Sequence, residues 1–212
     1  MQGNQKPPVS TVRAMFFIDF WNYELTMKEL EPTFLTDWFN LPKAMAQETC
    51  RVLGVPIQYE RCFIFGSYDP YKDMNLQNWA NTLLPKIPGV SVHFSPRQKR
   101  AKGPCCTGKG HHEVRECPYC QASMLGTQEK GVDTQIAMEM FDMAYSGLCD
   151  IMVLVSADKD FIPAVKRIWR RGVKVVHAYF PGYGHELAKE SWGSFDLFKI
   201  RGQFRRGRSG AV

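Results

Sequence analysis

The chain has 212 residues, of which 44% are hydrophobic and 23% are charged, which is typical of one folded domain with room for a small appendage. Its 27 lysines and arginines outnumber 21 acidic residues, so the formal net charge is +6. The longest apolar runs, Met15–Ile18 and Ile151–Val155, are far shorter than the roughly 20 residues that a membrane helix needs. Residues 1–13 are polar and lack the apolar core of a secretion signal, so we expect a cytoplasmic protein.

In chain order, apolar strand-like runs alternate with segments of helical spacing. Strands are predicted at residues 14–20, 57–65, 90–94, 151–155 and 173–180, and helices at 41–53, 73–84, 134–145 and 161–171. Strands that alternate with helices form right-handed βαβ units with a parallel sheet. The sequence therefore predicts an α/β fold, a three-layer α/β/α sandwich around a mainly parallel central sheet.

The domain is expected to span residues 14–200. An insertion at about 97–124 interrupts it, because this stretch is rich in Pro, Gly, Cys and His and has no periodicity. Residues 201–212 are basic and are expected to form a disordered tail.

Two predicted strands end abruptly in polar residues. Asp19 ends the first strand, Ser156, Asp158 and Asp160 follow the fourth, and Asp133 lies where the helix after the insertion begins. Ligands of parallel sheets bind beyond the carboxyl ends of the strands. Helix capping explains the residues after the fourth strand. A shared Mg²⁺ or Mn²⁺ also explains Asp19, whose carboxylate would be costly in an apolar segment without a compensating charge.

The positive charges are concentrated in three runs along the chain. These runs consist of Arg97, Lys99, Arg100, Lys102 and Lys109; Lys166, Arg167, Arg170, Arg171 and Lys174; and Lys199, Arg201, Arg205, Arg206 and Arg208. Clustered cations favour a polyanionic partner such as a nucleic acid, because binding releases counterions from the phosphates. Solvated surface and a basic tail explain each single run equally well.

The insertion holds a second set of candidate ligands, four of which would bind one zinc ion: Cys105, Cys106, His111, His112, Cys117 and Cys120. Cys117 and Cys120 form a CxxC pair, and one residue from each of the two adjacent pairs would complete a tetrahedral site. We expect a structural role, since the ligands fill all four positions. The alternatives are unrelated surface thiols or a redox CxxC, which would normally open a helix of a βαβ unit.

Three segments together resemble the NYN domain, in its LabA-like branch within the PIN-like nuclease superfamily: FIDFWN from Phe17, EKGVDTQIAMEM from Glu129 and VLVSADKDFIPAV from Val153. The resemblance covers about residues 14–180 and extends into the following segment, 182–198. It implies a PIN-like sandwich and Mg²⁺- or Mn²⁺-dependent hydrolysis of phosphodiester bonds in RNA, single-stranded RNA above all, with single-stranded DNA as a further partner.

By matching position, the resemblance implies a metal cluster of four aspartates, Asp19, Asp133, Asp158 and Asp160. It places Asn22 beside the cluster and gives Ser156 the role of orienting the Asp158 loop. Two positions depart from many relatives, which carry glycine at Ala157 and aspartate at Glu139. The leading prediction is a metal-dependent ribonuclease, and the alternative is a non-catalytic RNA-binding or regulatory protein that retains the fold.

Three further features are weaker candidates for a site, because each also has a structural explanation. Trp21 and Tyr23 flank Asn22 and either stack on a base or pack in the core. His177 lies in the fifth strand and is expected to be a core histidine. The turn-rich loop at residues 180–185 follows this strand and either lines a substrate groove or is an ordinary turn.

Overall fold

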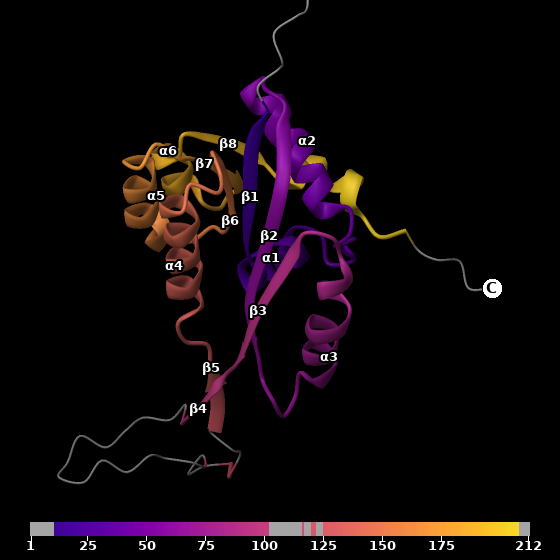
Figure 1. The fold of residues 1–212 in the computed structure, drawn as a ribbon. Coiled ribbons are helices and arrows are strands. Elements are labelled where there is room, and N and C mark those ends of the chain that lie inside the picture. The colour runs from indigo at the N-terminus through magenta and orange to yellow at the C-terminus, as the bar shows by residue number, and fades with distance from the viewer. Residues whose placement is uncertain (1–10, 102–115, 117–119, 122–124, 208–212) are drawn as a thin grey trace, which may run out of the picture.

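The computed structural model describes residues 11–101, 116, 120–121 and 125–207. Its central sheet has six strands in the order β3-β2-β1-β6-β7-β8, and every neighbouring pair is parallel. The strands are β1 (Val12–Asp19), β2 (Ile57–Tyr68), β3 (Val90–Pro96), β6 (Ile151–Val155), β7 (Lys174–Tyr179) and β8 (Gly193–Asp196). A separate antiparallel pair, β4 (Gln98–Ala101) and β5 (Leu125–Gln128), extends beyond the end of β3 (Figure 1). The predicted α/β fold with a mainly parallel sheet is confirmed.

Helices cover both faces of the sheet (Figure 1). One face carries α1 (Phe20–Leu30), α2 (Leu41–Leu53) and α3 (Met74–Thr82), and the other carries α4 (Val132–Tyr145), α5 (Ile162–Trp169) and α6 (His185–Glu190). Phe16 and Ile18 of β1 belong to the core on the first face, whereas Met15 and Phe17 belong to the core on the second. Because side chains of a strand alternate between faces, an apolar central strand serves both cores.

The predicted elements agree best with the structure where the apolar pattern is longest. The helix predicted at 41–53 and the strand at 151–155 have the bounds of α2 and β6. The apolar pattern did not predict α1, α6 or β8. α6 and β8 have only six and four residues, too few for a periodic pattern. Three short 3₁₀ helices complete the described part of the chain: η1 (Leu84–Lys86), η2 (Lys159–Phe161) and η3 (Phe198–Phe204).

The strand order reverses between β1 and β6. From β1 the chain proceeds outward through β2 to β3, and from β6 it proceeds in the opposite direction through β7 to β8. Ile18 pairs with Val155 in the register of β1 and β6, so Asp19 and Ser156 are the next residues on the two strands. Such a reversal leaves a crevice at the carboxyl ends of the two strands, which is where open α/β sheets bind their ligands.

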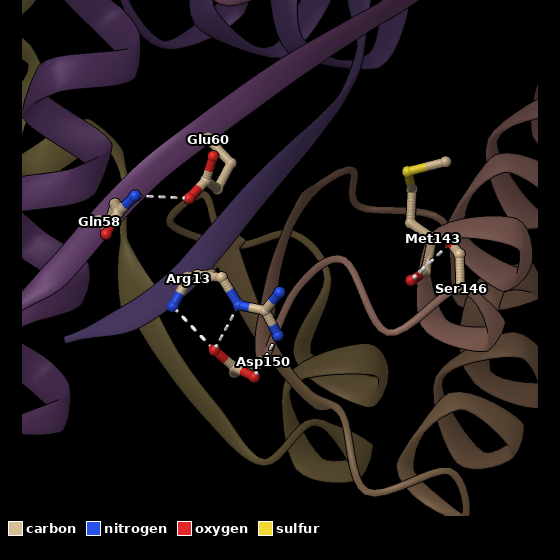
Figure 2. A network of polar contacts seen from close by, with 6 residues as sticks. All are labelled: Arg13, Gln58, Glu60, Met143, Ser146 and Asp150. Carbon is tan, nitrogen blue, oxygen red and sulfur yellow. Dashed lines mark hydrogen bonds and ion pairs between the residues drawn. The ribbon is translucent and has the colours of Figure 1, made fainter. Parts of the chain in front are cut away.

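An ion pair joins β1 and β6 at the opposite, amino edge of the sheet (Figure 2). Arg13 donates to both carboxylate oxygens of Asp150, with Nη2 3.0 Å from Oδ1 and Nε 3.2 Å from Oδ2. The backbone N–H of Arg13 also donates to Asp150 Oδ2 at 2.9 Å. These bonds hold the pKa of Asp150 below its usual range. The pair therefore helps to set the register that brings Asp19 level with Ser156.

Ordered structure continues beyond residue 200, where the tail was expected to begin. Phe204 in η3 is fully buried and packs edge-on against Phe34, with ring centroids 5.8 Å apart. Arg201 and Arg205 bind the same carboxylate, that of Glu31, at 2.9 Å and 2.5 Å. Two cations of the third basic run are therefore paired within the fold. No helix in the described part of the chain has the length and apolarity that crossing a bilayer requires.

Candidate active site

Asp19 ends β1 and caps the N-terminus of α1 at the crevice. Only 6% of the residue is exposed. Its Oδ1 accepts a hydrogen bond from the backbone N–H of Asn22 at 3.2 Å, and its Oδ2 accepts one from the hydroxyl of Ser156 at 3.4 Å. Burial first, and then the charges of Asp133 and Glu129, raise the pKa of Asp19 to about 7 against the lowering effect of these two hydrogen bonds. The carboxyl group thus faces other acids in a water-poor position.

Ser156 connects Asp19 to the loop that follows β6. The residue is fully buried. Its hydroxyl donates to Asp19 and accepts from the backbone N–H of Asp158 at 3.2 Å. Asp158 then caps η2 by accepting from the backbone N–H of Asp160 at 2.9 Å. The capping interpretation of this loop therefore holds for Asp158, and the same bonds hold the loop next to Asp19.

Asn22 ties the same loop to α1. Its side-chain Oδ1 accepts a hydrogen bond from the backbone N–H of Ala157 at 2.7 Å. The resemblance gives glycine as the common residue at position 157, but the φ of Ala157 is not in the left-handed region, since Gln121 is the only described non-glycine residue there. An alanine at this position therefore causes no backbone strain.

Asp133 lies in the first turn of α4, across the crevice from β1. Its pKa is raised by partial burial and by the charges of Asp158, Glu129 and Asp160. Asp133 is therefore within electrostatic range of Asp158 and Asp160, and its own charge raises the pKa of Asp19. Glu129 joins them and was not predicted, although it opens the EKGVD segment. Its carboxylate accepts a hydrogen bond from the Ser67 hydroxyl at the end of β2.

The donors of the site and their spacing determine whether it suits a divalent cation. Its donors are carboxylates, which suit Mg²⁺ or Mn²⁺, and burial followed by the neighbouring acidic charges raises the pKa values of Asp19 and Asp133. Among the described residues, however, no three His, Cys, Asp or Glu side chains lie close enough together to hold a metal ion. Mg²⁺ commonly uses one or two protein carboxylates together with waters and substrate phosphates. The carboxylate donors therefore suit such an ion. The described residues do not bring three protein ligands together around one point.

Comparison with family models decides the classification. The model of the NYN domain matches residues 13–194. The chain belongs to the NYN domain family. Membership implies a PIN-like nuclease domain whose substrate is nucleic acid, RNA in the first place.

Solved structures support the fold of this NYN domain. A protein of unknown function from Vibrio parahaemolyticus is 18% identical, with a TM-score of 0.59 over 97% of this chain and 100% of that chain, which shows a shared fold alone. A Sir2 homologue in complex with NAD is 12% identical, with a TM-score of 0.39 over 89% of this chain and 86% of that chain, too distant to carry an argument. No curated protein matches the chain.

His177 contacts the backbone of Ser156 at the acidic edge of the NYN domain. It is fully buried, which confirms the predicted core histidine. Its Nε2 lies 2.6 Å from the carbonyl oxygen of Ser156, which can only accept, so Nε2 carries the proton. Burial lowers the pKa of His177 to about 4 and keeps the ring neutral. The backbone of Gly184 packs against this ring, where an added Cβ would lie 2.7 Å from Cε1.

A cavity of about 420 Å³ lies between α4 and η2, beside two of the aspartates. Its lining combines these carboxylates with apolar side chains: Asp133, Thr134, Ala137, Met138, Phe141, Asp160 and Phe161. Glu139 lies elsewhere, in a cavity of about 440 Å³ that it shares with His93 and Asp142. The family position at Glu139 therefore faces edge strand β3 rather than the four aspartates.

The other predicted site residues fall into two groups. Tyr23 is fully buried, so it packs in the core and does not stack on a base. Of the six candidate zinc ligands, Cys120 is described and is an exposed thiol. The remaining five, Cys105, Cys106, His111, His112 and Cys117, lie outside the described residues. The zinc site therefore stays a prediction.

Proposed function

We propose that this NYN domain is a metal-dependent ribonuclease that hydrolyses phosphodiester bonds of single-stranded RNA. The observation that carries the proposal is the buried carboxyl group of Asp19 at the strand-order reversal. The residue is only 6% exposed. Burial first, and then the charges of Asp133 and Glu129, raise its pKa. Ser156 links the carboxyl group by hydrogen bonds to the Asp158 loop. A structural role alone does not explain why a fold would gather acids that raise one another's pKa values.

The proposed ion is Mg²⁺ or Mn²⁺, held by carboxylates drawn from Asp19, Asp133, Asp158 and Asp160. When bound, such an ion activates a water and neutralises charge on the attacking and leaving oxygens of the phosphate. Ser156 and Asn22 position the carboxylates, because they bond to the Asp19 and Asp158 segments. Asp19 would release a proton on ion binding, since its pKa lies near 7 in the folded chain. A structural zinc ion in the insertion is proposed separately.

Cleavage of labelled single-stranded RNA tests the proposal. We expect cleavage with Mn²⁺ or Mg²⁺ and none with chelator. Asp19→Asn and Asp158→Asn should each lower the rate by about a hundredfold or more, because a lost ion contact removes charge stabilisation in the transition state. Asp142→Asn, which removes an exposed acid of α4, is the matched control. Full activity in both site variants would overturn the proposal. The same cleavage assay with single-stranded DNA shows which nucleic acid is preferred.

The second candidate is a non-catalytic RNA-binding protein that retains the nuclease fold. The spacing of the acids favours it, because no three described His, Cys, Asp or Glu side chains gather closely enough for a metal ion. It predicts RNA binding with the same affinity in chelator and in Mn²⁺, and no cleavage in either.

A further inference from the structure

Arg97 is fixed at the acidic edge where the chain leaves β3 for the insertion. Its guanidinium carbon lies 4.8 Å from the ring centroid of Trp21. Its Nε donates to the hydroxyl of Ser67 at 2.9 Å, and its backbone N–H donates to the carbonyl of Tyr68 at 2.8 Å. Backbone, ring and hydroxyl contacts together leave the side chain few alternative conformations.

The ring beneath Arg97 is itself held in place. The indole N–H of Trp21 donates to the carbonyl oxygen of Ser67 at 2.6 Å. The ring also meets Phe20 edge-on, with centroids 5.1 Å apart. Trp21 therefore acts as a platform for the cation. Of the two alternatives for Trp21, packing against the core is observed, and a guanidinium group stacks on its ring.

A short chain of contacts links Arg97 to the acids of the site. The Ser67 hydroxyl accepts from Arg97 and donates to Glu129, and Ser67 is only 1% exposed. The charge of Glu129 in turn contributes to the raised pKa values of Asp19 and Asp133, so its carboxylate lies within electrostatic range of theirs. The guanidinium group is therefore a cation on the rim of a negatively charged crevice.

Several cations of the other two basic runs form ion pairs with described residues, whereas Arg97 forms none with them. Lys166 of the second run pairs with Glu190 at 3.0 Å. Arg201 and Arg205 of the third run pair with Glu31. Within the described part of the chain Arg97 forms no ion pair, and its hydrogen bonds there use Nε and the backbone.

We propose that Arg97, held by Trp21 and Ser67, binds a backbone phosphate of the nucleic-acid strand next to the acidic crevice. A polyanion that approaches crowded carboxylates needs a cation at their rim, and a planar guanidinium group suits phosphate oxygens. A guanidinium group fixed in advance also loses little side-chain entropy when a phosphate binds. The inference rests on the proposed function for the identity of the ligand, and it assigns strand binding rather than bond cleavage to Arg97.

Equilibrium binding of a fluorescent single-stranded RNA in chelator tests this role without cleavage. Arg97→Gln can still donate to Ser67 but is neutral. We expect it to weaken binding about five- to tenfold, and to lower the slope of log affinity against log salt concentration by about one, as for one lost phosphate contact. Arg97→Lys should retain the slope. Arg61→Gln removes another arginine that lies over an aromatic ring, that of Phe63, and should bind like the wild type.

The salt slope distinguishes phosphate binding from a structural role. An Arg97→Gln variant with the wild-type affinity and slope would overturn the inference, even if its melting temperature or its cleavage rate fell. If Arg97→Gln does not fold, Arg97→Lys is measured instead. Because lysine keeps the positive charge, a salt slope lowered by about one in Arg97→Lys would contradict phosphate binding at this position. Wild-type binding with a slope that depends on Arg97, but without cleavage in Mn²⁺, would overturn the nuclease proposal and leave this inference standing.

Discussion

Asn22 and Ala157 join the two strands on either side of the crevice, because the side-chain oxygen of Asn22 accepts the backbone N–H of Ala157 at 2.7 Å. The two residues are 135 positions apart in the chain. The bond holds the loop that carries Asp158 against the segment that carries Asp19. The position of one proposed ligand therefore depends on a side chain that need not contact the ion itself.

Loss of this bond should lower activity more than stability. We expect Asn22→Ala to reduce the rate of RNA cleavage roughly 10- to 100-fold, as is usual when a group that orients a metal ligand is removed. RNA binding in chelator should not change. Asn40→Ala is the control, because Asn40 also makes a side-chain bond, to Asp37, but at the start of α2. Equal cleavage by the two variants would contradict the positioning role of Asn22.

Asp19 should make the stability of the ion-free protein fall as pH rises. Its pKa is about 7 in the folded chain, against an ordinary value of 3.8. The folded state therefore binds more protons between these values, and the free energy of unfolding decreases as pH rises through this window. At pH 8 we expect Asp19→Asn to be more stable than the wild type by on the order of 3 kcal/mol in chelator, and nearly equal to it at low pH.

Urea unfolding from pH 5 to pH 8 measures this difference. Asp142→Asn serves as the control, since it removes an exposed acid of the same helix that carries Asp133. Addition of Mn²⁺ at pH 8 should stabilise the wild type and leave Asp19→Asn unchanged. Parallel pH profiles for Asp19→Asn and the wild type would show that Asp19 is not the group that titrates.

Gly184 and Gly182 offer a matched pair of substitutions. Both have φ in the left-handed region, +74° and +84°, so alanine should cost about 1 kcal/mol of backbone strain at either position. Nothing lies within 4 Å of a Cβ added at Gly182, whereas one added at Gly184 would lie 2.7 Å from His177 Cε1. We expect Gly184→Ala to lose a further 1–3 kcal/mol or so, because the core is overpacked.

The same substitution should impair cleavage, because His177 bonds to the carbonyl of Ser156. Urea unfolding and RNA cleavage of both glycine variants provide the measurement. If Gly184→Ala and Gly182→Ala lose the same stability and the same activity, then the His177 ring does not support the loop.

The proposed zinc site makes a separate prediction about metal content. Elemental analysis of the purified chain should find about one zinc ion per molecule, as for a single four-ligand site. Cys117→Ser and Cys120→Ser should each lower this content strongly, whereas Cys50→Ser should not, because Cys50 lies half-buried in α2. RNA cleavage in Mn²⁺ by a zinc-free variant would confine zinc to a structural role. A content near zero in the wild type would contradict the site.

Much of the candidate site could be predicted because it follows from strand ends. Asp19, Ser156 and Asp158 stand where long apolar runs stop, and the carboxyl ends of parallel strands meet at one edge of a sheet. Asp133 was predicted from its place at the start of a helix, and the family motifs then added it to the cluster. Glu129 opens one of these motifs, but its part in the site depends on the hydroxyl of Ser67, which is 62 residues away.

The sequence by itself determined the alternation of strands and helices, the bounds of α2 and β6, and the acids that follow the strands, because these depend on periodicity among near neighbours. Only the tertiary structure decided the strand order, the packing of Phe204 and the stacking of Arg97 on Trp21. It also decided the raised pKa of Asp19, since burial by residues distant in the chain removes water from its carboxyl group. Such desolvation and distant contacts arise only when the layers pack, so no local pattern of residues encodes them.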